Sequence, residues 1–238
     1  MDKFGKKYFL TNETATEQFL LFSKPKKIIK EIIEYHDKRK EYETLFYKTE
    51  WKRFIGSKKV LDIGCGEGTF LKYAPENIEA YGIDIDRKRI KELKKNKLNV
   101  KVSKIDKIPY KNEYFDGIYC SHVIEHVNDV FLLIKEIKRV LKRGGKLVIK
   151  TPNFATTYSS FYDDPTHKNP FTKVGLYRLL AMHGFKDIKI EYGIYYRPYT
   201  DVIYSLFSVL FYFPKIRFFI ERRYADIRKY EIIISAKK

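Results

Sequence analysis

The sequence predicts an α/β protein built around a doubly wound, mostly parallel sheet. From Lys59 to Lys150, short apolar runs alternate with helical segments through short connections, and such alternation gives a parallel sheet. The first run ends in a turn that contains Gly64, Gly66 and Gly68, and glycine lets a backbone turn approach a ligand closely. A second run ends in Asp84, about 20 residues later, the spacing at which a carboxylate reaches ribose hydroxyls. This turn therefore predicts a nucleoside-cofactor site.

The first 56 residues are predicted to form a helical extension that precedes the sheet. Apolar residues recur at three- and four-residue steps over residues 14–22 and 28–35, with Pro25 between them. Residues 37–48 are densely charged, which is typical of an exposed helix. We expect the aromatic side chains of residues 1–56 to pack against the main domain, and the alternative is a lid over the cofactor or the acceptor.

The main domain is expected to occupy residues 57–238. Its first part is predicted to hold strands at residues 60–63, 80–85, 99–103, 114–120 and 146–150, and helices at 70–73, 87–97 and 130–141. A long polar loop then covers residues 151–170, and long loops inside compact domains are usually functional. The remaining chain predicts a helix at 172–183, a strand at 185–192, an aromatic helical stretch at 201–220 and a final strand at 230–236.

The bulk composition is that of a globular protein with a strong basic excess. The net charge is +18, and its lysines are spread along the whole chain, so the excess either solvates the surface or meets nucleic acid or an anionic membrane. Two cysteines, Cys65 and Cys120, do not make a disulfide framework. No apolar run reaches the roughly 18 residues of a spanning helix, and the N-terminus has no apolar signal core. We therefore expect a cytoplasmic protein.

Four segments resemble, in order and spacing, the motifs of the class I S-adenosylmethionine-dependent methyltransferases. They are the glycine turn at residues 60–68, the acidic second strand at 82–86, the fourth strand with its flanks at 109–127, and the turn into the fifth strand at 141–147. A nicotinamide-binding domain would not be expected to repeat the later segments. The resemblance is to type 11/12-like members, including glycan and ubiquinone-type O-methyltransferases. It implies a Rossmann-like sheet of seven strands with an antiparallel last strand, and S-adenosyl-L-methionine as the cofactor.

The same resemblance implies a role for each residue around the cofactor. Asp62 would order the glycine turn or reach the cofactor's amino group through water. Asp84 would accept hydrogen bonds from both ribose hydroxyls, Ile85 would pack on the adenine, and Asp106 would lie near the adenine amino group. With the glycine turn and the backbone that would line the sulfonium, the implied cofactor set is Asp62, Gly64, Cys65, Gly66, Gly68, Asp84, Ile85, Asp106, Cys120 and Ser121.

An oxygen atom is the expected methyl acceptor. The fourth strand is followed neither by the Asn/Asp-Pro-Pro-Tyr element of amino methyltransferases nor by a Pro-Cys nucleophile. Residues 163–172 resemble a loop found in a subgroup that acts in glycan, lipopolysaccharide and lipid-precursor pathways. In this loop His167 is the candidate general base, because a histidine titrates near neutral pH, and Asp164 is the second candidate catalytic residue. The alternative is that the loop only builds a turn and caps the next helix.

A metal site is an alternative use of the histidines. His122, Glu125 and His126 have the three- and four-residue spacing that puts side chains on one helix face. With His122 in place of the first glutamate, they resemble the Glu-x-x-Glu-His arrangement that binds a divalent metal in ubiquinone-type O-methyltransferases and small-RNA 2′-O-methyltransferases. Together with His167 they would suit zinc or another transition metal. We favour the metal-free interpretation, in which Glu125 and His126 form a structural pair.

The segment at residues 193–229 is an aromatic and basic helical insertion before the last strand. We rank three roles for it. A lid or a homodimer contact is the first, and contact with the inner face of a membrane or with a lipid-linked acceptor is the second. A nucleic-acid contact is the third. The expected function is O-methylation of a small molecule, a sugar or a lipid-linked glycan. The alternatives are an RNA methyltransferase, including a metal-assisted 2′-O enzyme, and a non-catalytic cofactor-binding scaffold.

Overall fold

The computed structural model describes residues 39–193 and 230–238 of the 238-residue chain. The chain divides into two compact units, and the sheet belongs to the unit formed by residues 44–193 and 231–238. The other unit comprises residues 1–43 and 194–230, most of which lie outside the described residues. The helices expected at 14–22, 28–35 and 201–220, and with them the proposed roles of residues 193–229, therefore lie outside the described part of the chain, and so does most of the extension at 1–56.

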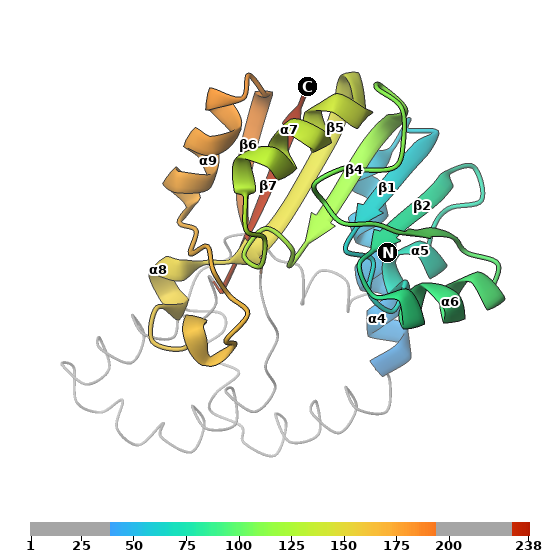
Figure 1. Cartoon of the computed structure of the whole chain (residues 1–238), viewed down its shortest axis with the longest axis horizontal. Helices are drawn as coiled ribbons and strands as arrows, with labels where there is room; N and C mark the ends of the chain where they lie inside the picture. Colours follow the sequence, from blue (N-terminus) through green and yellow to red (C-terminus); the bar gives the residue numbers. More distant parts are fainter. Residues whose placement is uncertain (1–38, 194–229) are drawn as a thin grey trace, which may run out of the picture. The chain divides into compact units, whose positions relative to one another are not determined.

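The sheet has seven strands in the order β3-β2-β1-β4-β5-β7-β6 (Figure 1). The first five strands pair in parallel, and β7 runs antiparallel between β5 and β6. The strands are β1 (Lys59–Ile63), β2 (Glu79–Asp84), β3 (Asn99–Val102), β4 (Phe115–Ser121), β5 (Leu141–Pro152), β6 (Lys186–Gly193) and β7 (Glu231–Lys237). The expected mostly parallel sheet with an antiparallel last strand is confirmed.

Helices cover both faces of this sheet, and Figure 1 shows α7 and α9 on its near side. The larger apolar cluster joins one face to α7 and α9, and the second cluster joins the other face to α4, α5 and α6. The helices and 3-10 turns are α4 (Arg39–Trp51), η1 (Lys52–Phe54), α5 (Thr69–Lys72), α6 (Arg87–Lys95), α7 (Val130–Val140), α8 (Phe154–Thr157), η2 (Phe161–Asp163) and α9 (Lys173–Met182).

The alternation of side chains along each strand explains the two clusters. In β4, Ile118 and Cys120 point into the first cluster, whereas Tyr119 points into the second, as the two-residue period of a strand requires. Tyr119 stacks on Phe70 with ring centroids 4.2 Å apart, and Phe70 stacks on Trp51 at 4.1 Å. Trp51, at the end of α4, thereby anchors that helix against the sheet.

The largest differences from the expected element boundaries lie in two places. The helix expected at residues 130–141 ends at Val140, and β5 begins at once with Leu141, because Leu141 already pairs with Phe115 before the register shifts. The loop expected at 151–170 contains the short helix α8, whose first turn is capped by the Asn153 side chain, and the turn η2. Within residues 39–193 and 230–238, no helix is long and apolar enough to cross a membrane.

Candidate functional site

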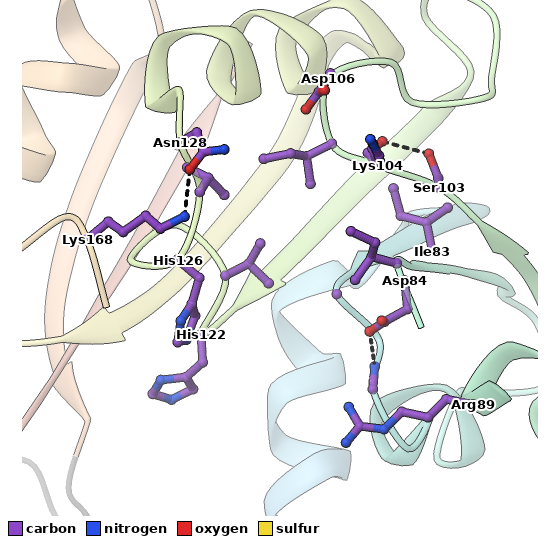
Figure 2. Close-up of a pocket in the computed structure, with 16 residues that line it drawn as sticks. Ile83, Asp84, Arg89, Ser103, Lys104, Asp106, His122, His126, Asn128 and Lys168 are labelled. Carbon is purple, nitrogen blue, oxygen red and sulfur yellow. Dashed lines mark hydrogen bonds between the residues drawn. The ribbon is translucent and has the colours of Figure 1, made fainter. Parts of the chain in front are cut away.

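A cavity of about 550 Å³ opens at the carboxyl ends of β1, β2 and β4 (Figure 2). In open α/β sheets, ligands bind outside the carboxyl ends of the strands, where the strand order reverses. Here the order reverses between β1 and β4. The residues of the cavity wall come from five places. They are Gly64 and Gly66 after β1, Ile83 to Ile85 at the end of β2 with Arg89 of α6, Ser103 to Asp106 after β3, His122, Val123 and His126 to Asn128 after β4, and Lys168 in the loop before α9.

The turn after β1 is shaped by glycine and ordered by Asp84. Gly64 and Gly66 have φ values of 72° and 49°, a region that costs other residues roughly 1–2 kcal/mol. A side chain at Gly64 would also collide with Val123. The Asp84 carboxylate accepts hydrogen bonds from the backbone N–H of Gly66 and of Asp86, both at 2.9 Å. Each carboxylate oxygen keeps acceptor capacity for a ligand hydroxyl.

Five residues of the implied cofactor set line the cavity: Gly64, Gly66, Asp84, Ile85 and Asp106. The remaining five are not among the residues that line it. Gly68 is the N-cap residue of α5, and a side chain there would meet Leu93. Ser121 is the last residue of β4.

Asp62, Cys65 and Cys120 are buried behind the cavity. Burial raises the pKa of the Asp62 carboxyl well above its ordinary value, and the charge of Asp84 adds to the effect. Burial also raises the pKa of the Cys65 thiol to about 12, with smaller contributions from both aspartates. It raises the pKa of Cys120 as well. Neither thiol forms a thiolate readily at neutral pH, so both are packing residues, consistent with their small size.

His126 is held by a short relay that fixes its tautomer. The Thr166 hydroxyl donates to Asp164 Oδ1 at 2.6 Å, so its oxygen accepts from His126 Nδ1 at 2.9 Å. Hydrogen bonds from the Thr166 hydroxyl and backbone N–H lower the pKa of Asp164. Because Nδ1 of His126 carries the proton in this arrangement, its Nε2 presents a lone pair in the neutral ring.

His167 has the same tautomer for a different reason. Its Nδ1 lies 2.6 Å from the backbone carbonyl oxygen of Phe161, which can only accept, so Nδ1 is the protonated nitrogen. The ring centroids of His126 and His167 are 4.7 Å apart. Asp164 Oδ2 lies 3.9 Å from His167 Nε2, whereas Asp164 Oδ1 accepts a hydrogen bond from the Thr166 hydroxyl at 2.6 Å. The structure brings both histidines together, although only His126 lines the cavity.

The four residues of the alternative metal site separate into two groups. Glu125, His126 and His167 can direct one ligand atom each to positions within 4.8 Å of one another. His122 instead places Nδ1 at 3.1 Å from Glu125 Oε1 and Nε2 at 2.7 Å from Glu231 Oε1. Burial alone would lower the pKa of His122, but the hydrogen bonds and charges of the two glutamates raise it to about 9.

Several residues of the site had no signal in the sequence. Glu231 meets His122 across 109 positions of the chain, and no local pattern marks such a contact. Lys104 and Lys168 line the cavity, but a lysine in a chain with so many lysines does not stand out. His126 was named in the sequence as a possible metal ligand, but its contact with Thr166, 40 positions away, had no local signal. Figure 2 shows His122 and His126 on the side of the cavity opposite Asp84 and Arg89.

Comparisons with known proteins agree with this geometry. The profile of a family described as a methyltransferase domain matches residues 61–149. An uncharacterised protein of Methanocaldococcus jannaschii is 33% identical over 172 residues, which cover 68% of this chain and 82% of the relative. The crystal structure of an S-adenosylmethionine-dependent methyltransferase from Archaeoglobus fulgidus is 29% identical, with a TM-score of 0.64 over 87% of this chain and 99% of that one.

Relatives with a named activity are matched over shorter segments. A tRNA U34 carboxymethyltransferase of Nautilia profundicola is 27% identical over 61% of this chain and 57% of the relative. A ubiquinone biosynthesis O-methyltransferase of Pelagibacter ubique is 37% identical over 40% of this chain and 42% of the relative. The chain thus spans about half the length of these two proteins, and their named substrates describe those proteins alone.

Proposed function

The chain belongs to the class I S-adenosylmethionine-dependent methyltransferases, and from this premise we propose that it methylates an oxygen atom of its acceptor. The acceptor is a small molecule, a sugar or a lipid-linked glycan. The observation that carries the proposal is the pair His126 and His167, whose Nδ1 protons are already committed to Thr166 and Phe161. A hydroxyl group must lose a proton during methylation, and a neutral imidazole with an available Nε2 suits that task.

The donor is assigned to the cavity between Asp84 and His126. The residues present fit S-adenosylmethionine, because the glycine turn lets a ligand lie against its backbone and Asp84 can accept from ribose hydroxyls. Ile85 is a large apolar side chain that is 67% exposed beside the cavity, which suits the face of an adenine. S-adenosylmethionine supplies an electrophilic methyl group, so the protein has to align the acceptor and take its proton.

The two histidines have different positions relative to the donor cavity. His126 lines it, so its Nε2 is our first candidate for the atom that receives the acceptor proton. His167 packs against His126 and is the second candidate. Asp164 acts through Thr166. Its carboxylate accepts a hydrogen bond from the Thr166 hydroxyl, and the oxygen of that hydroxyl accepts from His126 Nδ1. In many active sites a third group orients the base that activates the nucleophile. Here Thr166 and Asp164 would orient His126 and fix its tautomer.

The test is a screen of purified protein with labelled S-adenosylmethionine against small-molecule, lipid-linked sugar and RNA fractions. With the acceptor found, His126→Gln and His167→Gln separate the two candidate bases, because a general base typically contributes about 10²- to 10⁴-fold. We expect one of them to lose turnover on this scale while it still binds the donor. Asp84→Ala is expected to lose donor binding. Full turnover in both histidine variants would rule out the proposed base.

A second candidate function is metal-assisted methylation of an RNA 2′-hydroxyl, favoured by the cluster of Glu125, His126 and His167. The donor set fits a divalent transition metal, since it offers two imidazole nitrogens and a carboxylate. The hydrogen bonds of His126 and His167 through Nδ1 are the kind that orient metal-ligating imidazoles. These residues would hold the ion, and the ion would polarise the acceptor hydroxyl.

Metal analysis of the purified protein before and after chelation distinguishes the two candidates. A bound divalent ion at one equivalent, lost in His167→Gln, would favour the metal-assisted function. Activity that is unchanged by chelator, with no bound metal, would leave the histidines as bases. RNA binding that weakens steeply with salt would support an RNA acceptor in either case.

A further inference from the structure

His122 has an unusual backbone conformation at the end of β4. Its φ is 53°, a region in which residues other than glycine are uncommon. Its backbone N–H donates to the carbonyl oxygen of Lys150 at 2.9 Å. Such conformations persist where the surroundings over-determine them, and they cluster at functional sites. The surroundings of this residue are therefore informative.

Both ring nitrogens of His122 face carboxylate oxygens. Glu125 Oε1 lies 3.1 Å from Nδ1, and Glu231 Oε1 lies 2.7 Å from Nε2. Carboxylates only accept, so the ring has to donate from both nitrogens, which only the protonated imidazole does. The side chains of Glu125 and Glu231 are 0% and 6% exposed. Removing the ring would leave two buried carboxylates without their shared cation, a costly arrangement.

The contacts continue from His122 into three other elements. Thr151 of β5 donates its hydroxyl to Glu125 Oε2 at 3.0 Å. Lys150 of β5 places Nζ at 3.1 Å from Glu231 Oε2 and at 3.9 Å from Glu50 Oε2 of α4. The ends of β4, β5 and β7 and the helix α4 are thus joined by one chain of charges, in which the glutamates and Lys150 are buried and the His122 ring is 42% exposed. A surface ion pair contributes little, but a buried network of this kind specifies one arrangement.

The residues next to His122 form part of the cavity wall. The Val123 side chain packs onto Gly64, where it leaves no room for a side chain. Two residues further on, the backbone carbonyl oxygen of Glu125 accepts from the N–H groups of Lys168 and Asn169 at 2.7 and 3.0 Å. The segment 122–125 therefore touches the glycine turn through Val123 and holds the loop that carries His167.

We propose that His122 is a positioning residue of the donor cavity. Its ring, shared between Glu125 and Glu231, places Val123 against the glycine turn and thereby sets the affinity for S-adenosylmethionine. The inference rests on the proposed assignment of the donor to this cavity. It also gives His122 a role that does not involve a metal, because both ring nitrogens are already used.

Chemical rescue tests the inference without knowledge of the acceptor. The variant His122→Gly keeps the backbone conformation, since glycine adopts positive φ freely, and it opens a site for free imidazole. We expect the Kd of the full-length protein for S-adenosylmethionine, measured by titration calorimetry, to rise about tenfold in His122→Gly. Added imidazole is expected to restore it to within about threefold of wild type. Glu231→Gln is expected to weaken binding as well, without rescue by imidazole.

A matched control for Glu231→Gln lies on β7 and its neighbour β6. Asp187 of β6 makes an exposed ion pair with Lys237 of β7 at 2.8 Å, so Asp187→Asn removes one carboxylate charge from this strand pair without touching His122. Its Kd should equal that of wild type. Thermal midpoints of all variants, with and without imidazole, separate stability from donor binding.

Each outcome is decisive. Wild-type affinity in His122→Gly, or imidazole that raises the thermal midpoint of this variant without restoring its Kd, would overturn the inference. If His122→Gly does not fold, Glu231→Gln takes its place, and wild-type affinity in that variant would overturn the inference as well. If Asp84→Ala binds the donor normally, the assignment of the cavity has failed instead.

Discussion

At the residue scale, the buried carboxyl of Asp62 is the group whose behaviour should change most when the donor binds. Asp62 is only 4% exposed. Burial is the largest cause of its raised pKa, and the nearby charge of Asp84 is the second. The resemblance to the methyltransferases implies that Asp62 either orders the glycine turn or reaches the amino group of the donor through water, and we propose the second role. A positive charge in that place favours the ionised carboxylate.

Donor binding should therefore lower the pKa of Asp62 and release a proton at pH values between the pKa of the bound form and that of the free form. Since the pKa of the free protein is raised and the bound cation would lower it, affinity should increase as pH rises through the pKa of the free protein, and level off above it. In Asp62→Asn this dependence should disappear. Calorimetric titrations in two buffers with different ionisation enthalpies count the protons released. An identical proton count in wild type and Asp62→Asn would show that another group is responsible.

Asp164 has a structural partner that the spacing of residues within its own loop does not reveal. Asp164 and His167 were predicted together from one loop, and the structure does place them near each other, at 3.9 Å. The closer link, however, runs from Asp164 through Thr166 to His126. That link spans 40 positions of the chain, so the spacing within the loop could not reveal it.

At the element scale, α7 holds the loop that follows β3. Arg139 donates to the backbone carbonyl oxygens of Tyr110 and Ile108, both at 2.8 Å. Glu136 accepts from the backbone N–H of Ile108 at 2.9 Å and from Arg139 at 2.7 Å. The same loop carries Asp106 into the cavity wall. Two side chains one helical turn apart on α7 thus determine where the far wall of the cavity lies.

This arrangement predicts an acid-sensitive contribution to stability. The hydrogen bond from Arg139 is the largest cause of the lowered pKa of Glu136, opposed by burial and assisted by Ile108. A lowered pKa in the folded state means that the stabilisation is complete above the unfolded pKa of about 4.3. It is lost as pH falls through the folded value.

We expect Glu136→Gln to lower the free energy of unfolding by about 1.5–3 kcal/mol at pH 7, the range for hydrogen bonds to charged groups. The difference from wild type should shrink towards pH 3. Urea denaturation at both pH values measures it. Glu92→Gln is the control, because Glu92 makes only an exposed pair with Lys95, which should contribute little at either pH. An equal loss in both variants would contradict the prediction.

At the scale of the whole molecule, the C-terminal strand β7 lies between β5 and β6 in the sheet. β7 pairs with both β5 and β6, and its first residue, Glu231, lies opposite Gly193 at the end of β6. Antiparallel strands that meet in this way can be joined by a two-residue turn. The unit of residues 44–193 and 231–238 is compact by itself. Residues 194–230 should therefore be dispensable for the sheet.

We expect a shortened chain, in which residues 39–193 are joined to residues 231–238 through Asn-Gly, to fold cooperatively. It should bind S-adenosylmethionine within about tenfold of the full-length affinity, that is within about 1.4 kcal/mol. Thermal unfolding and titration calorimetry measure both properties. A folded variant that no longer binds the donor would show that the omitted segments contribute to the donor cavity.

The sequence by itself determined the strands, their parallel arrangement and the cofactor. These features depend on local signals, namely the period of apolar residues in β1 to β5, the glycines that follow β1 and Asp84 at the end of β2. Such signals act within a few residues or one strand–helix unit. The insertion of β7 between β5 and β6 was decided only by the tertiary structure. So were the meeting of His122 with Glu231 and the relay from Asp164 to His126. These contacts join residues 40 to 109 positions apart, where packing and buried charge, rather than local periodicity, select the partners.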